Sequence, residues 1–141
     1  MEYLEGITLK ELIKKEERIP EEVAVRMMMP IIKLLKALHS DGIIHRDISP
    51  DNIFLCNNGN IKLIGFSVAK FYTNDNRAIV RTTGYSPIEQ YYFAGKIGPW
   101  SDVYALGATM YRMITGVKPE ESTERKMRDT LVPPKALAAI I

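Results

Sequence analysis

The residues of this chain with the clearest chemical potential lie in the segment "GIIHRDISPDNIFL", residues 42 to 55. Asp47 supplies a carboxylate there, and Asn52 supplies a carboxamide a few residues later. Side chains of these types serve in acid–base chemistry and in cation binding. They also cap turns that precede strands, which is a common structural role for Asp and Asn. The two residues alone leave both interpretations open, so the elements around them must decide.

The composition indicates a globular chain with no obvious charged partner. Of 141 residues, 46% are hydrophobic and 26% are charged, and the 19 basic and 17 acidic residues are mixed along the chain. We therefore expect no nucleic-acid partner. The one cysteine, Cys56, cannot form an internal disulfide, which indicates a reducing compartment. The chain carries neither a leader pattern nor an apolar run of about 18 residues, so we expect a soluble cytoplasmic location and no membrane partner.

Two helices are expected before the chemical segment. Thr8 and Glu11 form the Thr-x-x-Glu pattern that begins a helix, here a short and highly charged one. Pro20 is typical of the first position of a longer helix, which Pro30 should kink or loosen and Gly42 should end. An apolar stripe at helical spacing is expected to face the core: Val23, Met27, Ile31, Leu34, Leu35 and Leu38.

Strands and a long loop are expected next. The runs "IIH" and "NIFLC" are typical of short strands, and the Asn-Gly turn in "NNGN" leads into "IKLIGF" to give a hairpin. Residues 67 to 99 lack periodicity and carry many Thr, Tyr, Asn and Gly. We therefore expect a long loop there with at most a brief helical piece. A loop of this length inside a compact domain is usually functional or mobile.

A third helix should carry an aspartate in its first turn. Ser101 is expected to cap "DVYALGATMYRMITG", and Gly116 is expected to end it. Its apolar face is predicted to consist of Val103, Leu106, Met110, Met113 and Ile114. Together these elements predict a mainly α fold with a small β-hairpin, in the α+β class.

Three segments at compatible spacings carry a family resemblance: "HRDISPDN", "TTGYSPIEQY" and "PWSDVYALGA". With the order helix, His-Arg-Asp loop, hairpin, long loop and helix, they resemble the C-terminal lobe of the eukaryotic-like protein Ser/Thr kinases, particularly their bacterial members. The resemblance runs from residue 1 to about residue 120. It implies that residues 1–141 form a partial protein kinase domain, a C-lobe fragment. The family activity is transfer of the γ-phosphoryl group of ATP to protein Ser or Thr.

The resemblance implies roles for particular residues. Asp47 would be the catalytic carboxylate that accepts the proton of the substrate hydroxyl, and Asn52 would bind one Mg²⁺. Thr82 would contact the catalytic aspartate, and the backbone of Glu2 and Leu4 would meet the adenine of ATP. ATP and Mg²⁺ are therefore the expected cofactors, and a protein substrate or a partner protein is the expected partner.

Other positions receive structural or regulatory roles from the same resemblance. Asp102 would accept hydrogen bonds from the catalytic-loop backbone, with Gly107 allowing close packing around it, and His45 would pack and form hydrogen bonds. Arg46 would pair with a phosphate on the long loop, although an ordinary surface arginine is the alternative. The candidate phosphate acceptors are Thr73, Thr82 and Thr83.

Several positions depart from the family pattern. Ser49, at a catalytic position, stands where the class usually carries a lysine that neutralises the transferred phosphate. Gly65, Phe66 and Ser67 stand in place of Asp-Phe-Gly, whose aspartate is the main protein ligand of Mg²⁺. Gly65 has no side chain that could bind a metal ion. A plain strand end is therefore as good an interpretation of this segment as a metal role.

The resemblance also bears on the two ends of the chain. Residues 1 to 6 resemble the hinge between kinase lobes, so the N-lobe, the last C-lobe helices and an arginine partner for Glu89 are expected to be missing. We expect a truncated or mis-started kinase, inactive by itself, with an N-lobe-bearing chain or a second copy as candidate partners. The alternatives are a noncatalytic, pseudokinase-like binding module and, more remotely, a small-molecule phosphotransferase suggested only by Ser49.

Overall fold

The computed structural model describes residues 5–65, 70–71, 85–91, 98–119, 121–122 and 125, with residues 70, 71 and 91 described by their backbone alone. In chain order its elements are β1 (Gly6–Thr8), α1 (Leu9–Glu16), α2 (Glu21–Ser40), β2 (Ile43–Ile44), η1 (Pro50–Asn52), β3 (Ile53–Cys56), β4 (Ile61–Leu63), β5 (Lys70–Phe71), η3 (Ile88–Tyr91) and α3 (Pro99–Thr115). The predicted fold class, mainly helical with a small antiparallel sheet, is confirmed.

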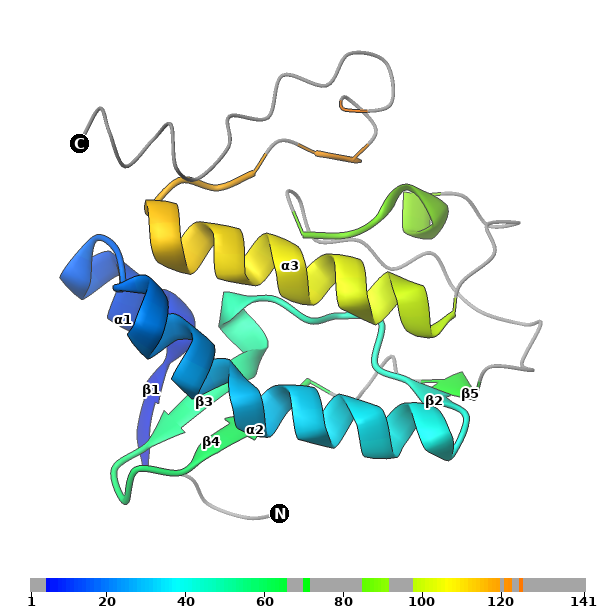
Figure 1. Cartoon of the computed structure of the whole chain (residues 1–141), viewed down its shortest axis with the longest axis horizontal. Helices are drawn as coiled ribbons and strands as arrows, with labels where there is room; N and C mark the ends of the chain where they lie inside the picture. Colours follow the sequence, from blue (N-terminus) through cyan, green and yellow to red (C-terminus); the bar gives the residue numbers. More distant parts are fainter. Residues whose placement is uncertain are drawn as a thin grey trace.

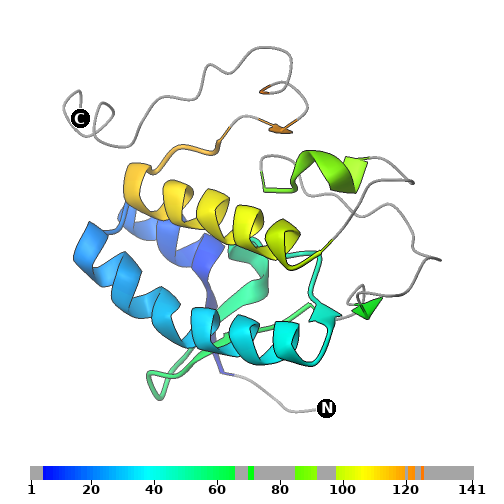
Figure 2. The same ribbon diagram turned by 45° about the vertical axis from the view of Figure 1, so that its right-hand side comes forward.

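Helices α2 and α3 lie side by side and form the main helical layer (Figure 1). Strands β1, β3 and β4 form an antiparallel sheet against α1 and α2, and the ribbon of β2 and β5 lies toward the C-terminal end of α2. The short helix η3 lies on the side of α3 away from α2 in both views (Figure 2). This arrangement places the chain between β2 and β3 close to the first turn of α3.

Helix α1 begins as the sequence predicts. The Glu11 amide donates a hydrogen bond to Thr8 Oγ1 at 3.2 Å, and the Thr8 amide donates to Glu11 Oε1 at 3.3 Å. These reciprocal bonds satisfy two amides that the first helical turn leaves without an intrahelical partner. The short helix therefore has a fixed start, although only Leu9 and Ile13 of its residues are buried.

Helix α2 continues through Pro30 and ends at Ser40. Gly42, two residues after the helix, has a positive φ of 75°. Pro20 was expected at the first helical position, but it is the N-cap residue, and the helix begins at Glu21. Ile31 and Leu35 of the predicted stripe are buried, but Val23 is 39% exposed and its assignment to the core was wrong. The buried face is shifted slightly around the helix and consists of Ala24, Met28, Ile31 and Leu35.

The predicted hairpin is confirmed. Strands β3 and β4 pair antiparallel, with Ile53 opposite Leu63, and the Cys56 amide donates to the Asn60 carbonyl at 2.8 Å across the turn. Two strands were not predicted: β1 adds a third strand along β3, and β5 pairs with β2. Both are very short, and the residues that pair with them lie far along the sequence, so local pattern gives little sign of them.

Helix α3 begins at Pro99, with Gly98 as the preceding cap, so the prediction that Ser101 caps it was wrong. Ser101 occupies the third helical position and is fully buried. The helix ends as expected at Gly116, whose left-handed φ of 73° suits a residue without Cβ. Val103 of the predicted apolar face is 61% exposed, which overturns its assignment to the core.

The hydrophobic core joins all three helices to the sheet and to the chain that carries Asp47. Its buried members are Leu9, Ile13, Ile19, Ala24, Met28, Ile31, Leu35, Ile48, Ile53, Leu63, Ala105, Leu106 and Met113. Ile48 directly follows Asp47 and Ile53 directly follows Asn52, so core packing anchors the chain next to each of these residues. Within the described ranges, no helix has the length and apolar character needed to span a bilayer.

Candidate functional site

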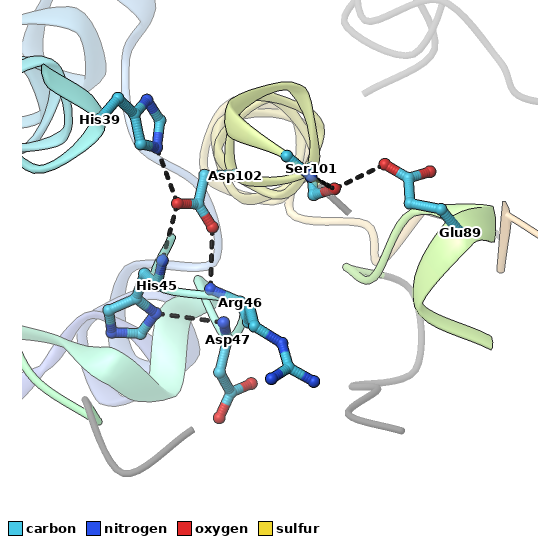
Figure 3. Close-up of polar contacts among 8 residues, drawn as sticks. His39, His45, Arg46, Asp47, Glu89, Ser101 and Asp102 are labelled. Carbon is cyan, nitrogen blue, oxygen red and sulfur yellow. Dashed lines mark hydrogen bonds and ion pairs between the residues drawn. The ribbon is translucent and has the colours of Figure 1, made fainter. Parts of the chain in front are cut away.

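The segment from His45 to Asn52, called the catalytic loop below, is held by the carboxylate of Asp102 (Figure 3). Asp102 lies in the first turn of α3 and is fully buried. Its Oδ2 accepts a hydrogen bond from the His45 amide and its Oδ1 accepts one from the Arg46 amide, each at 2.9 Å. The predicted role of Asp102 is confirmed.

His39 adds a third donor to the same carboxylate. Its Nε2 lies 2.8 Å from Asp102 Oδ2, and the residue comes from the last turn of α2. Asp102 therefore connects α2, α3 and the catalytic loop through one buried group, as Figure 3 shows. Sequence reasoning missed His39, because a histidine near a helix end gives no sign of a partner 63 positions away.

His45 fixes the backbone at Asp47. The Asp47 amide donates to His45 Nδ1 at 3.1 Å, so Nδ1 must be an acceptor and Nε2 must carry the ring proton. Nε2 then donates to the Ile64 carbonyl at 2.7 Å, just beyond β4. The ring is fully buried, and the packing and hydrogen-bonding role predicted for His45 is confirmed.

The structure brings Asp47 and Asn52 together. Asn52 Nδ2 donates to the Asp47 carbonyl at 2.7 Å and to Asp47 Oδ2 at 3.0 Å. Both bonds use the amide nitrogen of Asn52 as a donor, so each of its two protons has an acceptor. The Asn52 side chain thus closes the loop onto its own aspartate and orients the carboxylate.

Gly65 lies against this closed loop with a positive φ of 78°. A Cβ atom at this position would lie 2.5 Å from both Cγ and Oδ1 of Asn52 and 2.7 Å from its Nδ2. The Ile64 amide also donates to the Asn52 carbonyl at 2.8 Å, which holds the two segments together. The volume that a side chain at position 65 would need is therefore occupied by Asn52.

The described residues lack the principal carboxylate expected for a bound Mg²⁺, and the assignment of Asn52 as a Mg²⁺ ligand stays a prediction. Magnesium is usually held by one or two carboxylates together with phosphate oxygens. Gly65 contributes no ligand, and an oxygen of Asp47 already accepts a hydrogen bond from Asn52. Across the described part of the chain, no cluster of three or more His, Cys, Asp or Glu residues is arranged to hold a metal ion.

Of the remaining residues predicted to be catalytic or to bind a cofactor, the structure describes only Ser49. Ser49 is 1% exposed, and its carbonyl accepts a hydrogen bond from the Asn52 amide at 3.0 Å, so the residue helps to form the turn of η1. Its catalytic assignment stays a prediction. Outside the described residues lie Glu2, Leu4, Phe66, Ser67, Thr73, Thr82 and Thr83.

Gln90 connects the catalytic loop to η3. Its Nε2 donates to the Arg46 carbonyl at 2.8 Å, and both residues are 2% exposed. Arg46 has a φ of 75°, an uncommon value for a residue with a side chain, so the surroundings must hold this backbone. The burial of Arg46 contradicts the alternative of an ordinary surface arginine. Sequence reasoning missed Gln90, and its place in "YSPIEQY" was the available signal.

Glu89 has a partner that the sequence did not indicate, and Gly107 differs from expectation. Ser101 Oγ donates to Glu89 Oε2 at 2.7 Å and accepts a bond from the Gly98 amide at 3.2 Å, so Glu89 has a partner in α3 (Figure 3). Among the described residues, and apart from its chain neighbours and the backbone of α3 itself, no heavy atom lies within 4 Å of a Cβ built on Gly107. Close packing at Gly107 against that part of the structure was therefore a wrong expectation.

Known proteins with similar sequences include bacterial protein kinases. Residues 1–136 match the family described as the protein kinase domain. A probable serine/threonine-protein kinase of Clostridium perfringens is 34% identical over 146 residues, covering 96% of this chain and 21% of that protein. Serine/threonine-protein kinase PknL of Mycobacterium tuberculosis is 35% identical over 123 residues, covering 84% of this chain and 31% of that protein.

The fold is similar as well. The solved structure of PpkA-294 in its apo form has a TM-score of 0.76 and 30% sequence identity, and the match covers 99% of this chain and 53% of that one. The chain thus spans between 21% and 31% of these two curated relatives and about half of the solved structure.

Proposed function

The chain belongs to the protein kinase family, and from that premise we propose that it is a C-lobe that holds a protein serine or threonine at Asp47 without itself transferring the phosphoryl group. Asp47 supplies a carboxylate that can accept the proton of a substrate hydroxyl. One observation carries the proposal: the Asn52 side chain fills the space beside Gly65, where the family has a metal-binding carboxylate.

The positioning half of the proposal is supported by how firmly Asp47 is held. Its amide is bound by His45 Nδ1, and its carbonyl and carboxylate are both bound by Asn52 Nδ2. The neighbouring residues are fixed by the buried Asp102. A carboxylate whose backbone and side chain are both restrained is well suited to orienting a substrate hydroxyl.

The charges around the loop support the inference that this chain does not transfer the phosphoryl group. Phosphoryl transfer needs positive charge near the transferred group, and each tenfold loss of rate corresponds to about 1.4 kcal/mol of transition-state stabilisation. Gly65 removes the carboxylate that would hold a cation there, and Ser49 is neutral and buried. We therefore infer that this chain retains the loop geometry without the charge that makes transfer fast.

The finer parts of the proposal follow the family resemblance. The backbone of Glu2 and Leu4 would meet the adenine of ATP, and Thr82 would lie beside Asp47. The substrate would be a cytoplasmic protein, and a chain bearing an N-lobe or a second copy of this chain would be the partner. The named relatives are serine/threonine-protein kinases, which favours protein over small-molecule substrates.

A second candidate function, a noncatalytic binding module, is favoured by the same contact of Asn52 with the Gly65 position. The two candidates differ in what a repaired site would do. A chimera that carries a kinase N-lobe together with Gly65→Asp and Ser67→Gly should phosphorylate a generic protein substrate if the loop is a working catalytic loop. An inactive but folded chimera would favour the binding module.

The proposal is tested directly by thermal unfolding of the purified chain in the presence of ATP. A ligand that binds only the folded state raises the melting temperature. We expect any shift with ATP to be the same with Mg²⁺ and with EDTA, because Gly65 supplies no carboxylate that could hold the metal ion. A shift that requires Mg²⁺, and that Asn52→Ala removes, would contradict the proposal.

A further inference from the structure

A small cavity lies beside the catalytic loop, between helices α1 and α3. Its volume is about 190 Å³, and it is called the basic cavity below. Its lining residues are Lys10, Ile13, Pro50, Asp51, Tyr85, Arg112 and Lys118. These residues come from α1, the turn η1, the segment before η3, and the C-terminal end of α3 with the residues after it.

Positive charge predominates in the basic cavity. Lys10, Arg112 and Lys118 are cations, and Asp51 is the one anion among the lining residues. Lys10 Nζ lies 3.5 Å from Asp51 Oδ1, but these side chains are 68% and 56% exposed, so their pairing is weak. Asp51 can neutralise at most one of the three cations. The cavity therefore keeps a net positive charge at neutral pH.

Tyr85 adds a neutral hydrogen-bond donor to the cavity wall. The residue is 7% exposed, and burial is the main cause that raises the pKa of its hydroxyl, with Asp51 acting in the same direction and Arg112 in the opposite one. The phenol therefore stays protonated at neutral pH. Lys118 Nζ lies 5.7 Å from the centre of the Tyr85 ring, which is within the range of a cation–π contact.

Apolar groups surround these charges on one side. Ile13 is 1% exposed, and Pro50 is also buried, so part of the wall excludes water. A charge interaction is stronger where water is partly excluded than at an open surface. Arg112 Nη1 donates to the Gly116 carbonyl, which places its guanidinium at the end of α3.

The basic cavity adjoins the proposed substrate position. Pro50 and Asp51 line the cavity, and they belong to the same turn as Asn52, whose side chain binds Asp47. A peptide whose hydroxyl residue lies at Asp47 would need only a few residues of extended chain, at about 3.4 Å each, to reach a neighbouring cavity.

We propose that the basic cavity binds an anionic side chain of the peptide that this lobe holds, either a carboxylate or a phosphoryl group, through Lys10, Arg112, Lys118 and the Tyr85 hydroxyl. The identity of the ligand as a substrate peptide rests on the proposed function, whereas anion binding rests on the cavity itself. Arginine and lysine recognise both anions, and the planar guanidinium of Arg112 can bind either in a bidentate manner.

Fluorescence anisotropy with matched short peptides tests this proposal on the full chain. One peptide carries a serine flanked by glutamates, a second replaces the glutamates with glutamines, and a third replaces one glutamate with phosphoserine. We expect at least about tenfold tighter binding of an anionic peptide than of the glutamine peptide, weakening as salt rises. The tighter of the two anionic peptides identifies the preferred anion.

Two variants and a control locate the binding. Arg112→Glu and Lys118→Glu should each abolish the preference for anionic peptides, and the second keeps the test valid if the first fails to fold. Lys33→Glu makes the same charge change on the exposed surface of α2, outside the cavity lining, and should leave the preference intact. Equal binding of charged and neutral peptides, or equal loss in Lys33→Glu, would overturn the proposal.

A separate readout distinguishes this inference from the proposed function. Peptide binding is measured without ATP, so it does not depend on phosphoryl transfer. Anionic preference at the cavity, together with no competition by a serine-containing neutral peptide, would support the anion site and contradict its use for the Asp47 substrate. No anionic preference would reject the site while leaving the role of Asp47 to its own test.

Discussion

The two sides of the catalytic loop differ in what they retain. On the α3 side, the buried Asp102 accepts hydrogen bonds from His39, His45 and Arg46. On the β4 side, Gly65 supplies no carboxylate, and Asn52 occupies the space that a side chain would fill. The first side carries the bonds that hold the loop, and the second has no carboxylate at position 65.

This contrast separates the requirements of folding from those of chemistry. Asp102 is fully buried and binds the amides of His45 and Arg46, so its loss would leave two buried amides without acceptors, at a cost to stability. A carboxylate at position 65 would serve a ligand rather than the core, and replacing it with glycine leaves the packing around Asn52 complete. Function resides in local sites carried by folds, and one such site can be lost while the fold is kept.

The largest expected effect is on the α3 side. Asp102→Ala should lower the free energy of unfolding by about 3 kcal/mol or more, because it strands the buried amides of His45 and Arg46. Urea unfolding monitored by circular dichroism measures the loss. The exposed Asp41, at the end of α2, offers a matched control, and Asp41→Ala should cost no more than about 0.5 kcal/mol. Similar costs for the two variants would contradict the role of Asp102.

An intermediate effect is expected on the β4 side. Gly65→Ala should cost about 1–3 kcal/mol, because the new Cβ would meet the Asn52 side chain and the backbone φ is positive. In an Asn52→Ala background, Gly65→Ala should destabilise the chain less, because only the strain of the positive φ remains. A double-mutant cycle measures this coupling between positions 52 and 65. Gly107→Ala, in the exposed part of α3, is the control and should be neutral or stabilising. Strictly additive effects would show that Asn52 does not occupy the site.

A smaller effect is expected for His39. His39→Ala removes one of the three donors to Asp102 while leaving both backbone donors, so it should cost about 1–2 kcal/mol. The same substitution should have little further effect in an Asp102→Ala background, because the shared bond is already lost. Full additivity of the two losses in urea unfolding would show that His39 acts elsewhere.

The smallest effect is expected on the pH dependence of stability, and it concerns Tyr85, which lies on neither side of the loop. Burial raises the pKa of Tyr85 above its value of about 10 in the unfolded chain. The stability that this shift contributes is fully present below the unfolded pKa and is lost as pH rises through the folded pKa. Tyr85→Phe should remove this step from the pH profile of urea unfolding. An unchanged profile between pH 9 and pH 11, within about one pKa unit of 10, would contradict it.

The elements that were predicted correctly are those whose signals are local. Thr8 and Glu11 are three residues apart and bind each other at the start of α1. The Asn-Gly turn joins β3 to β4 within one short segment. The strands β1 and β5 were missed because their partners come from distant segments, and Val103 was misplaced because helical periodicity does not say how far the core reaches around α3.

Contacts in the site could be predicted where family motifs contain both partner residues. They could not be predicted where only the packing of the elements brings the partners together. Asp102 and the loop backbone were paired from the family motifs, and their hydrogen bonds confirm the pairing. Gln90 and His39 bind the same assembly, but neither carries a sequence signal that names its partner. The contact between Asn52 and the Gly65 position depends on how η1 packs beside the end of β4, which no local pattern specifies.

The most direct test of the central claim is phosphoryl transfer by the purified chain itself. The chain is incubated with γ-labelled ATP, Mg²⁺ and a generic protein substrate, with Asp47→Asn as the matched control. We predict that label transfer by the unaltered chain does not exceed that of Asp47→Asn, because Gly65 supplies no metal-binding carboxylate. Transfer that depends on Asp47 would contradict the account.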